Sequence, residues 1–303
     1  MRLSILLLLG VLCGSLSAVF VRWSTAPSLV LALYRMAFSV VLVAPAAWRR
    51  RKELAALSGR TQLLCLASGG ALGLHFATFF QAVKTTSIAS AAVLVDMEVL
   101  FVALATVAVF RKKLPLAAWL AMALAFGGAV VMALADSGGG NNALSGDLLA
   151  VLSAMLIGIY TLIGSVCRRT MTTTAYTCLV YTAALGTLLA LALASGTPLT
   201  GYGAENLATA LAMAVFCTLL GHSVFSWALK YFPPSFVSTA RLMDCVFSAV
   251  WGALLFSELP AMQALLGGVA VISGVVLYTK SETRGGKGES EPCGSSGNTG
   301  SAR

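Results

Sequence analysis

The sequence predicts an all-α integral membrane protein with ten transmembrane helices, arranged as two inverted repeats of five helices. The first observation behind this prediction is composition. Of the 303 residues, 58% are hydrophobic and only 10% are charged, whereas about 25% of residues are charged in a typical soluble domain. The second observation is a series of ten long apolar runs, and the third is an internal duplication. We therefore expect the lipid bilayer to cover most of the surface.

The apolar runs define the expected helices, because about 20 apolar residues cross the hydrocarbon core of a bilayer. The expected spans are residues 3–21, 28–48, 62–83, 86–110, 115–135, 147–167, 172–194, 206–229, 235–257 and 260–279. The first run lasts to Val21, which is longer than the apolar region of a typical signal peptide. We therefore interpret it as an uncleaved first span.

The duplication relates residues 81–115 to residues 227–260 at an offset of 146 positions. At this offset an acidic residue occupies the same place in both copies, Glu98 in the first and Asp244 in the second. We assign residues 1–135 to the first repeat, 136–146 to an external linker and 147–280 to the second repeat. Residues 281–303 are rich in Gly, Ser, Glu and Lys, so we expect them to form a disordered cytoplasmic tail.

The distribution of basic residues predicts the topology. With the N-terminus inside, 16 of the 20 Lys and Arg residues lie on the cytoplasmic side, and only Arg22 and Lys84 lie outside. Basic loops stay in the cytoplasm, so both termini are predicted to be cytoplasmic, in the inner or plasma membrane. Since each repeat has five spans, the second repeat crosses the membrane upside down, as in transporters whose site lies near the midplane. The net charge of +9 lies in these loop clusters, so we predict no nucleic-acid partner.

Several short motifs occur in a fixed order along the chain. They are Tyr34-Arg35, FFQAVKTTSIASAAVL at 79–94, GHSVFSWALKYFPPSFVS at 221–238, FSELP at 256–260 and GGVAVISGVVLY at 267–278. In these motifs the chain resembles the EamA-type transporters of the drug/metabolite transporter superfamily, over roughly residues 3–280. The resemblance implies a ten-helix inverted-repeat fold that moves small organic solutes, often outward, through a central cavity.

The chain departs from the pattern of that family at two kinds of position. The family has a proline in the middle of the fourth and ninth spans, often after a glutamate, but here Val99 follows Glu98 and Cys245 follows Asp244. The residue that would ordinarily break each helix is therefore missing. In addition, Glu258 retains a family glutamate in the second half, whereas Lys112 replaces it in the first half.

Five charged residues lie within the expected spans: Arg35, Asp96, Glu98, Arg241 and Asp244. A charge in the middle of a membrane helix is costly and indicates a functional site by default. Arg241 and Asp244 are three positions apart, so they can pair on one helix face, either as a static bridge or as part of a cavity wall. Asp96 and Glu98 project about 200° apart on a helix. We expect Glu98 to face the central site and Asp96 to contact a neighbouring helix.

Arg35 has three interpretations that the sequence leaves open. It can be the counter-ion of one of the acids, the ligand of a carboxylate or phosphate on the substrate, or a structural residue bonded to helix carbonyls. The buried acids also leave open whether transport is coupled to protons or uncoupled.

Histidines and aromatic residues add further candidates. His75 and His222 match within one position at the repeat offset, and they can either bond neighbouring helices or relay protons. Tyr181 falls where the repeat places Arg35, and both Tyr181 and Trp227 are candidates to line the cavity. The pairs Gly10/Gly14 and Gly69/Gly73 allow close helix packing, either within the chain or across a homodimer interface.

These features together predict a secondary transporter that exports small organic metabolites, such as amino acids or amphipathic compounds. The alternatives are a membrane enzyme that acts on a lipid-like substrate and a membrane scaffold or sensor that does not transport. Enzyme motifs such as His-Glu-x-x-His, Gly-x-Ser-x-Gly and the Walker A loop are missing from the sequence. We therefore expect no enzymatic activity, and we predict no cofactor and no metal site.

Overall fold

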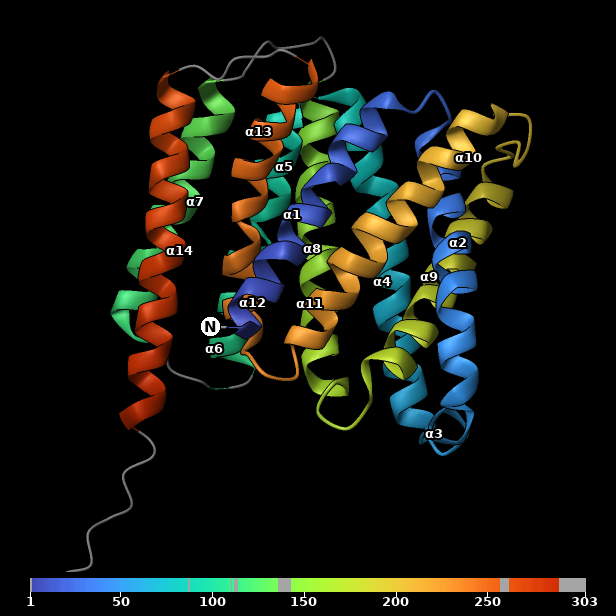
Figure 1. Ribbon diagram of the computed structural model, residues 1–303, viewed down its shortest axis with the longest axis horizontal. Helices are drawn as coiled ribbons and strands as arrows, with labels where there is room; N and C mark the ends of the chain where they lie inside the picture. The colour runs from blue at the N-terminus through green and yellow to red at the C-terminus, as the bar shows by residue number, and fades with distance from the viewer. Residues whose placement is uncertain are drawn as a thin grey trace, which may run out of the picture.

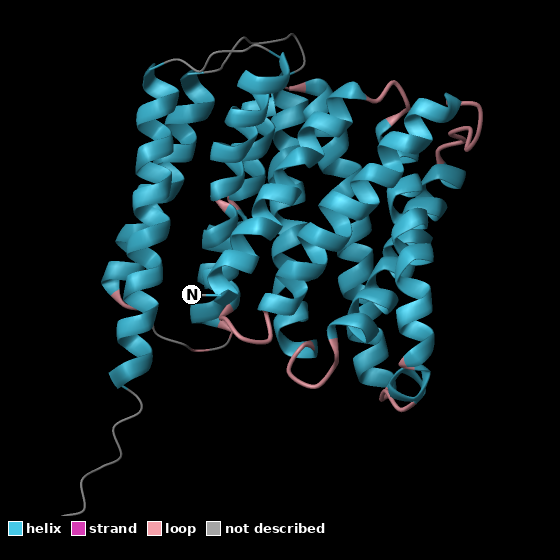
Figure 2. Cartoon of the chain, in the orientation of Figure 1, coloured by secondary structure: helices cyan, strands magenta, loops and turns pink. Residues whose placement is uncertain are grey.

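The computed structural model describes residues 2–86, 88–109, 111, 114–135, 143–256 and 262–288, and no strand occurs among them (Figure 2). Helices account for nearly all of these residues. In chain order they are α1 (Arg2–Trp23), α2 (Ser28–Arg49), α3 (Arg51–Ala55), α4 (Gly59–Thr85), α5 (Ile88–Asp96), α6 (Glu98–Ala108), α7 (Leu116–Ala135), α8 (Ala143–Cys167), α9 (Thr173–Ala194), α10 (Gly203–Ala212), the π-helix η1 (Met213–His222), α11 (Ser223–Ala228), α12 (Pro234–Arg241), α13 (Met243–Phe256) and α14 (Met262–Gly288).

Among the residues that the structure describes, six stretches of helix are long and apolar enough to cross a membrane. They are Ile5–Trp23 in α1, Ser28–Arg49, Gly59–Thr85, Leu144–Cys167 in α8, Thr173–Ala194, and Gly203–Ala228, which joins α10, η1 and α11. Shorter apolar helices, Leu116–Gly128 and Leu265–Tyr278, lie within α7 and α14. The all-helical fold class is confirmed for the described residues. At its C-terminal end α14 continues to Gly288, into the segment for which the sequence predicted disorder.

Two of the expected spans are each divided into two helices. The span expected at 86–110 is interrupted at Met97, between α5 and α6, and the span expected at 235–257 is interrupted at Leu242, between α12 and α13. Each break is a tight turn, in which the Met97 amide donates to Leu94 O at 3.3 Å and the Leu242 amide donates to Thr239 O at 3.2 Å. Both breaks thus exist without the prolines that the related family uses.

Charged residues at the new helix ends help to explain why the breaks are stable. Glu98 lies in the first turn of α6 and Asp244 in the first turn of α13, whereas Arg241 lies in the last turn of α12. An acid near a helix N-terminus and a base near a helix C-terminus both interact favourably with the helix dipole. Glu98, Asp244 and Arg241 therefore stabilise helix ends as well as facing the interior.

Glycines allow neighbouring helices to approach closely. A Cβ atom on Gly73 of α4 would lie 2.9 Å from the Ala184 carbonyl oxygen of α9, and one on Gly274 of α14 would lie 2.6 Å from the Ala125 amide nitrogen of α7. The second contact belongs to the pair α7 and α14, which lie side by side along one edge of the bundle (Figure 1). Gly10 in α1 likewise faces Val224 of α11. These glycines pack helices of the same chain.

Two hydrophobic clusters form the core, and a cavity lies where they meet. The first, which includes Leu72, Phe76 and Val95, is built mainly from α2, α4, α8 and α9. The second, which includes Val11 and Phe225, is built mainly from α1, α7, α12 and α14. Members of both clusters line the cavity, so the site lies between the two clusters.

Candidate functional site

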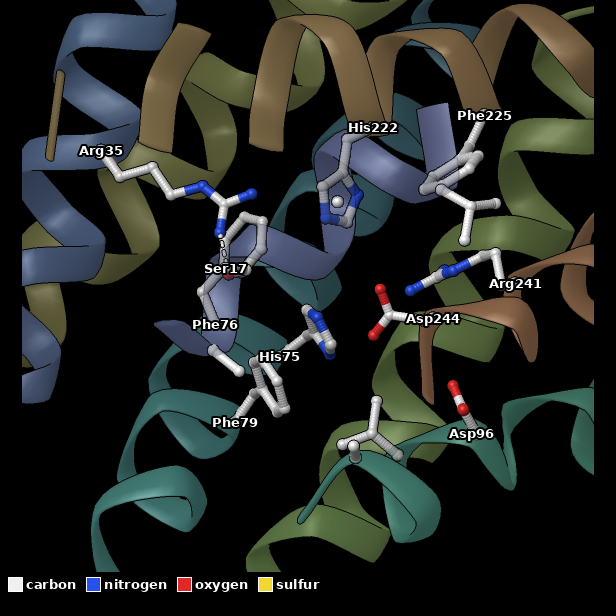
Figure 3. Close-up of a pocket in the computed structure, with 15 residues that line it drawn as sticks. Ser17, Arg35, His75, Phe76, Phe79, Asp96, His222, Phe225, Arg241 and Asp244 are labelled. Carbon is white, nitrogen blue, oxygen red and sulfur yellow. Dashed lines mark hydrogen bonds between the residues drawn. The ribbon is translucent and has the colours of Figure 1, made fainter. Parts of the chain in front are cut away.

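The cavity is small and carries most of the buried charges of the bundle (Figure 3). Its polar lining consists of Ser17, Arg35, His75, Asp96, His222, Arg241 and Asp244, and its aromatic lining consists of Phe76, Phe79 and Phe225. The volume is about 50 Å³. Because one water needs roughly 10–15 Å³ of such space, the cavity holds a few water molecules in this conformation. A metabolite would require the helices to move apart.

The broken spans place charges at four helix ends in or beside this cavity. Asp96 ends α5, Glu98 begins α6, Arg241 ends α12 and Asp244 lies in the first turn of α13. Asp96, Arg241 and Asp244 line the cavity, but Glu98 is not part of its wall. This differs from the expectation that Glu98 would face the central site, and Asp96, which was expected to contact a neighbouring helix, is part of the cavity wall. The break at Met97 places Asp96 and Glu98 on different helices. The angle that the sequence analysis expected between these two side chains holds only for one continuous helix, so it does not apply here.

Glu98 is instead held in a buried polar cluster. Its Oε2 atom lies 2.8 Å from Arg241 Nη1. Its Oε1 atom accepts hydrogen bonds from Thr161 Oγ1 at 2.7 Å and from Ser238 Oγ at 3.1 Å. The carboxylate is 3% exposed, yet each oxygen has a partner. Glu98 thus connects α6 with α8 and α12, and its charge is compensated.

The expected pair between Arg241 and Asp244 is replaced by this pair with Glu98. Among the described residues, Asp244 has no hydrogen bond and no ion pair within 4 Å. Figure 3 shows the Arg241 guanidinium on the same side of the cavity as Asp244. The Arg241 guanidinium also lies 5.2 Å from the centre of the Phe225 ring. The Asp244 carboxylate therefore faces the cavity while Arg241 is held by Glu98.

Arg35 is almost fully buried on α2, with an exposed fraction of 1%. Its Nε atom donates to Thr218 Oγ1 at 2.7 Å, and its Nη1 atom donates to Ser17 Oγ at 3.1 Å. The guanidinium stacks over Phe76 at 4.2 Å from the ring centre, in a favourable cation–π contact. Within the described part of the chain, Nη2 has no hydrogen-bond partner and no carboxylate pairs with Arg35.

His75 and His222, one from each half of the sequence, meet at the cavity with ring centres 6.4 Å apart. The Nδ1 atom of His75 bonds Ser153, at 2.7 Å from its hydroxyl. The Nδ1 atom of His222 is buried and has no partner among the described residues. His75 therefore joins two helices, as one interpretation of the sequence predicted, whereas His222 retains a free ring nitrogen.

The two aromatic candidates, Tyr181 and Trp227, do not line the cavity. The Tyr181 hydroxyl lies 3.0 Å from Ser223 Oγ and 3.4 Å from Thr218 O. The Trp227 ring packs on Tyr231 at 5.0 Å between ring centres. The sequence expectation that these residues line the site differs from their observed positions. Tyr181 instead supports the segment that holds Arg35.

That segment is the π-helix η1, which sequence reasoning did not predict. It contributes Thr218 and His222, and it lies between α10 and α11 in one membrane-length stretch. Single π-turns are often found at functional sites, because the wider turn redirects side chains. No residue type signals such a turn locally, so the sequence did not identify Thr218 or Ser17 as hydrogen-bond partners of Arg35.

Arg168 is a second residue whose placement the sequence did not predict. It was expected to be one of the solvated basic residues that set the topology, but its side chain is 2% exposed. It donates to Ser226 O at 2.9 Å, to Thr173 Oγ1 at 2.7 Å and to Met171 O. Burial lowers the pKa of Arg168 from its usual range. Arg168 thereby attaches the α8–α9 loop to α11.

An enclosed charged cavity within membrane-length apolar helices defines the class of the protein, a multi-pass membrane transporter. The chain belongs to the EamA-like transporter family, whose model matches residues 1–134 and 144–280. The resemblance noted in the sequence is thereby confirmed.

Individual relatives agree with this membership. An uncharacterized transporter of Archaeoglobus fulgidus is 28% identical over 257 residues, which is 82% of this chain and 86% of the relative. The pseudopaline exporter CntI of Pseudomonas aeruginosa is 25% identical over 261 residues, 86% of this chain and 88% of the relative. A solved crystal structure superimposes with a TM-score of 0.77 at 16% identity, covering 93% of this chain and 98% of the other, and shows the same fold.

Proposed function

We propose that the chain is a secondary transporter that exports small organic metabolites by alternating access to the cavity between its two broken spans. The observation that carries this proposal is the cavity itself, which collects Arg35, Asp96, Arg241 and Asp244 in the interior of an apolar bundle. Such charges are costly to insert in a membrane and are retained where they act on a solute. The name of the relative CntI, an exporter, supports the outward direction.

The proposed architecture is ten spans in two inverted five-helix repeats, with both termini in the cytoplasm and the protein in the inner or plasma membrane. Two observations support it. The family model matches two segments of similar length, and the breaks at Met97 and Leu242 lie within one position of the 146-residue offset of the duplication. Rocking of one set of helices against the other would open the small cavity to each side in turn.

An export screen tests this function. The chain is overexpressed in a bacterial host, and compounds that accumulate in the medium are measured by mass spectrometry against a vector control. Export of at least one small metabolite is the expected result. If a protonophore stops export, transport is coupled to protons, and if it does not, the carrier is uncoupled. A strain with altered membrane lipids and unchanged medium would favour an enzyme, and no change in either would favour a scaffold or sensor.

A further inference from the structure

Three sulfur-containing side chains meet at the end of the bundle where α3 and the α8–α9 loop lie (Figure 1). Cys65 lies in α4, Cys167 ends α8, and Met171 lies in the loop that follows. Cys65 Sγ lies 3.7 Å from Met171 Sδ, and the Cys65 and Cys167 thiols also interact. The Met171 amide donates to Cys167 O at 3.1 Å, which holds these two residues on one turn. Both cysteines are free, and none of the three residues is more than 3% exposed.

This group of side chains is a ligand set that soft metal ions prefer. Thiolate and thioether sulfurs select ions such as Cu(I). A metal–sulfur bond is about 2.3 Å long, so two ligands of a planar three-coordinate ion lie about 4.0 Å apart. The 3.7 Å between Cys65 Sγ and Met171 Sδ is close to this spacing. A second feature, the charge beside the sulfur atoms, distinguishes a metal site from core packing.

That charge is the buried guanidinium of Arg168. It donates to Met171 O and to Thr173 Oγ1, so it lies against the backbone of one sulfur ligand. In the part of the chain that the structure describes, no carboxylate lies within 4 Å of it. The Glu53 carboxylate, which acts on Arg168 from farther away, is bonded to Thr172 instead. An unpaired buried charge is costly, and a Cu(I) ion with two thiolates carries the single negative charge that would offset it.

A divalent ion fits this site less well than a monovalent one. Zn(II) ordinarily takes four protein donors in a structural site, and the described residues contain no group of three or more His, Cys, Asp or Glu that could hold a metal ion. Met171 is a third donor for a soft ion only. Arg169 and Thr170, which lie between Cys167 and Met171, are exposed. Displacement of this one turn therefore gives an ion a route to the sulfur atoms.

We propose that Cys65, Cys167 and Met171 form a binding site for one soft monovalent metal ion of the Cu(I) class. Binding releases the two thiol protons to water, forms three metal–sulfur bonds and changes no oxidation state. The bound ion would join α4 to the α8–α9 loop. The sequence led us to expect no metal site, because only the fold brings these segments together. The proposal goes beyond metabolite export and does not depend on it.

Titration of the reduced, purified full-length chain with Cu(I) tests the site. The ion is buffered by a chromophoric Cu(I) chelator in detergent without oxygen, and the ion retained per chain is measured. We expect one tightly held ion, and an affinity lowered about tenfold or more in Cys65→Ala, in Cys167→Ala and in Met171→Leu, because changes near a metal cost about 10–100-fold. The controls Cys178→Ala and Met155→Leu remove sulfur atoms outside the cluster and should bind like the wild type.

X-ray absorption at the copper edge identifies the ligands directly. The loaded wild type should show three sulfur neighbours at about 2.3 Å, and Met171→Leu should show two. Size-exclusion chromatography and circular dichroism record whether each variant folds. Met171→Leu keeps the volume of the side chain, so it tests the site even if a cysteine variant unfolds. No retained ion on the folded wild type, or equal affinity in wild type and Met171→Leu, would overturn the proposal and leave the export function untouched.

Discussion

Arg241 Nη1 lies 2.8 Å from Glu98 Oε2, so an ion pair joins the two broken spans of the bundle. Glu98 begins α6 and Arg241 ends α12. The same carboxylate accepts hydrogen bonds from Thr161 and Ser238, which ties α8 to the two breaks. The two acids therefore have different roles. Glu98 anchors the breaks, and Asp244 remains exposed to the cavity.

Removal of the Glu98 charge should destabilise the protein. In Glu98→Gln the amide can still accept from Thr161 and Ser238, but Arg241 is left buried without its counter-charge. Breaking a buried ion pair costs about 3–5 kcal/mol. Because the Arg241 side chain is 15% exposed, we expect a value near the lower limit, about 3 kcal/mol. Unfolding of the purified variants in detergent measures it. The double variant Glu98→Gln, Arg241→Gln should recover part of the loss, and strictly additive losses would contradict the account.

Asp244→Asn should have the opposite pattern, with activity lost and stability retained. The carboxylate lines the cavity and has no hydrogen bond or ion pair with a described residue, so its neutralisation weakens only the favourable interaction with the α13 dipole. We expect stability within about 0.5 kcal/mol of wild type and transport lowered about tenfold or more, the effect of losing a hydrogen bond to a charged group. Transport rate per molecule in membranes is the readout. A stability loss as large as that of Glu98→Gln would show that Asp244 is structural.

Close packing of α4 on α9 predicts a contrast between two neighbouring glycines. In Gly73→Ala the new Cβ atom would lie 2.9 Å from Ala184 O, so the helices must separate. Overpacking of this kind costs about 1–3 kcal/mol. In Gly70→Ala the nearest atom is Thr187 Oγ1 at 3.8 Å, an ordinary contact. This control should be neutral or stabilising, since alanine favours helix over glycine. Equal thermal stability of the two variants would argue against the packing described.

The hydroxyl of Thr218 should act as a positioning group for Arg35. Thr218→Val keeps the shape of the side chain but leaves Arg35 Nε without its 2.7 Å partner. An unsatisfied buried donor costs about 1–3 kcal/mol. Thr182→Val is the control, because that hydroxyl is exposed and bonds only Cys178 O of its own helix. Affinity for transported compounds, measured as the concentration giving half-maximal rate, should worsen in the first variant alone.

The sequence predicted the fold class and the buried charged residues better than it predicted which residues these charges contact. Arg35, Asp96, Glu98, Arg241 and Asp244 stand out because a charge within an apolar run has few structural explanations. Their pairing depends on where the spans break, and those breaks lie at Met97 and Leu242 without proline to signal them. The sequence-based expectation assumed continuous helices, on which Arg241 can pair with Asp244 and Glu98 faces the cavity.

Other features lacked any local signal. The π-helix η1 places Thr218 against Arg35 through a change in helical pitch that no residue type marks. Arg168 has the sequence context of a solvated loop residue, yet three contacts between distant segments bury it. The positions of Thr218 and Arg168 both depend on contacts between segments far apart in the chain. The residues of a single segment do not predict such contacts.

The central claim is that the cavity opens to both sides of the membrane in turn, and cysteine labelling tests it most directly. Val95 lines the cavity from α5 and is 6% exposed. A single cysteine is placed there by Val95→Cys after the seven native cysteines are replaced. A membrane-impermeant thiol reagent is then applied to either face of sealed vesicles. Alternating access predicts labelling from each face. Labelling from one face only, or from neither, would contradict it.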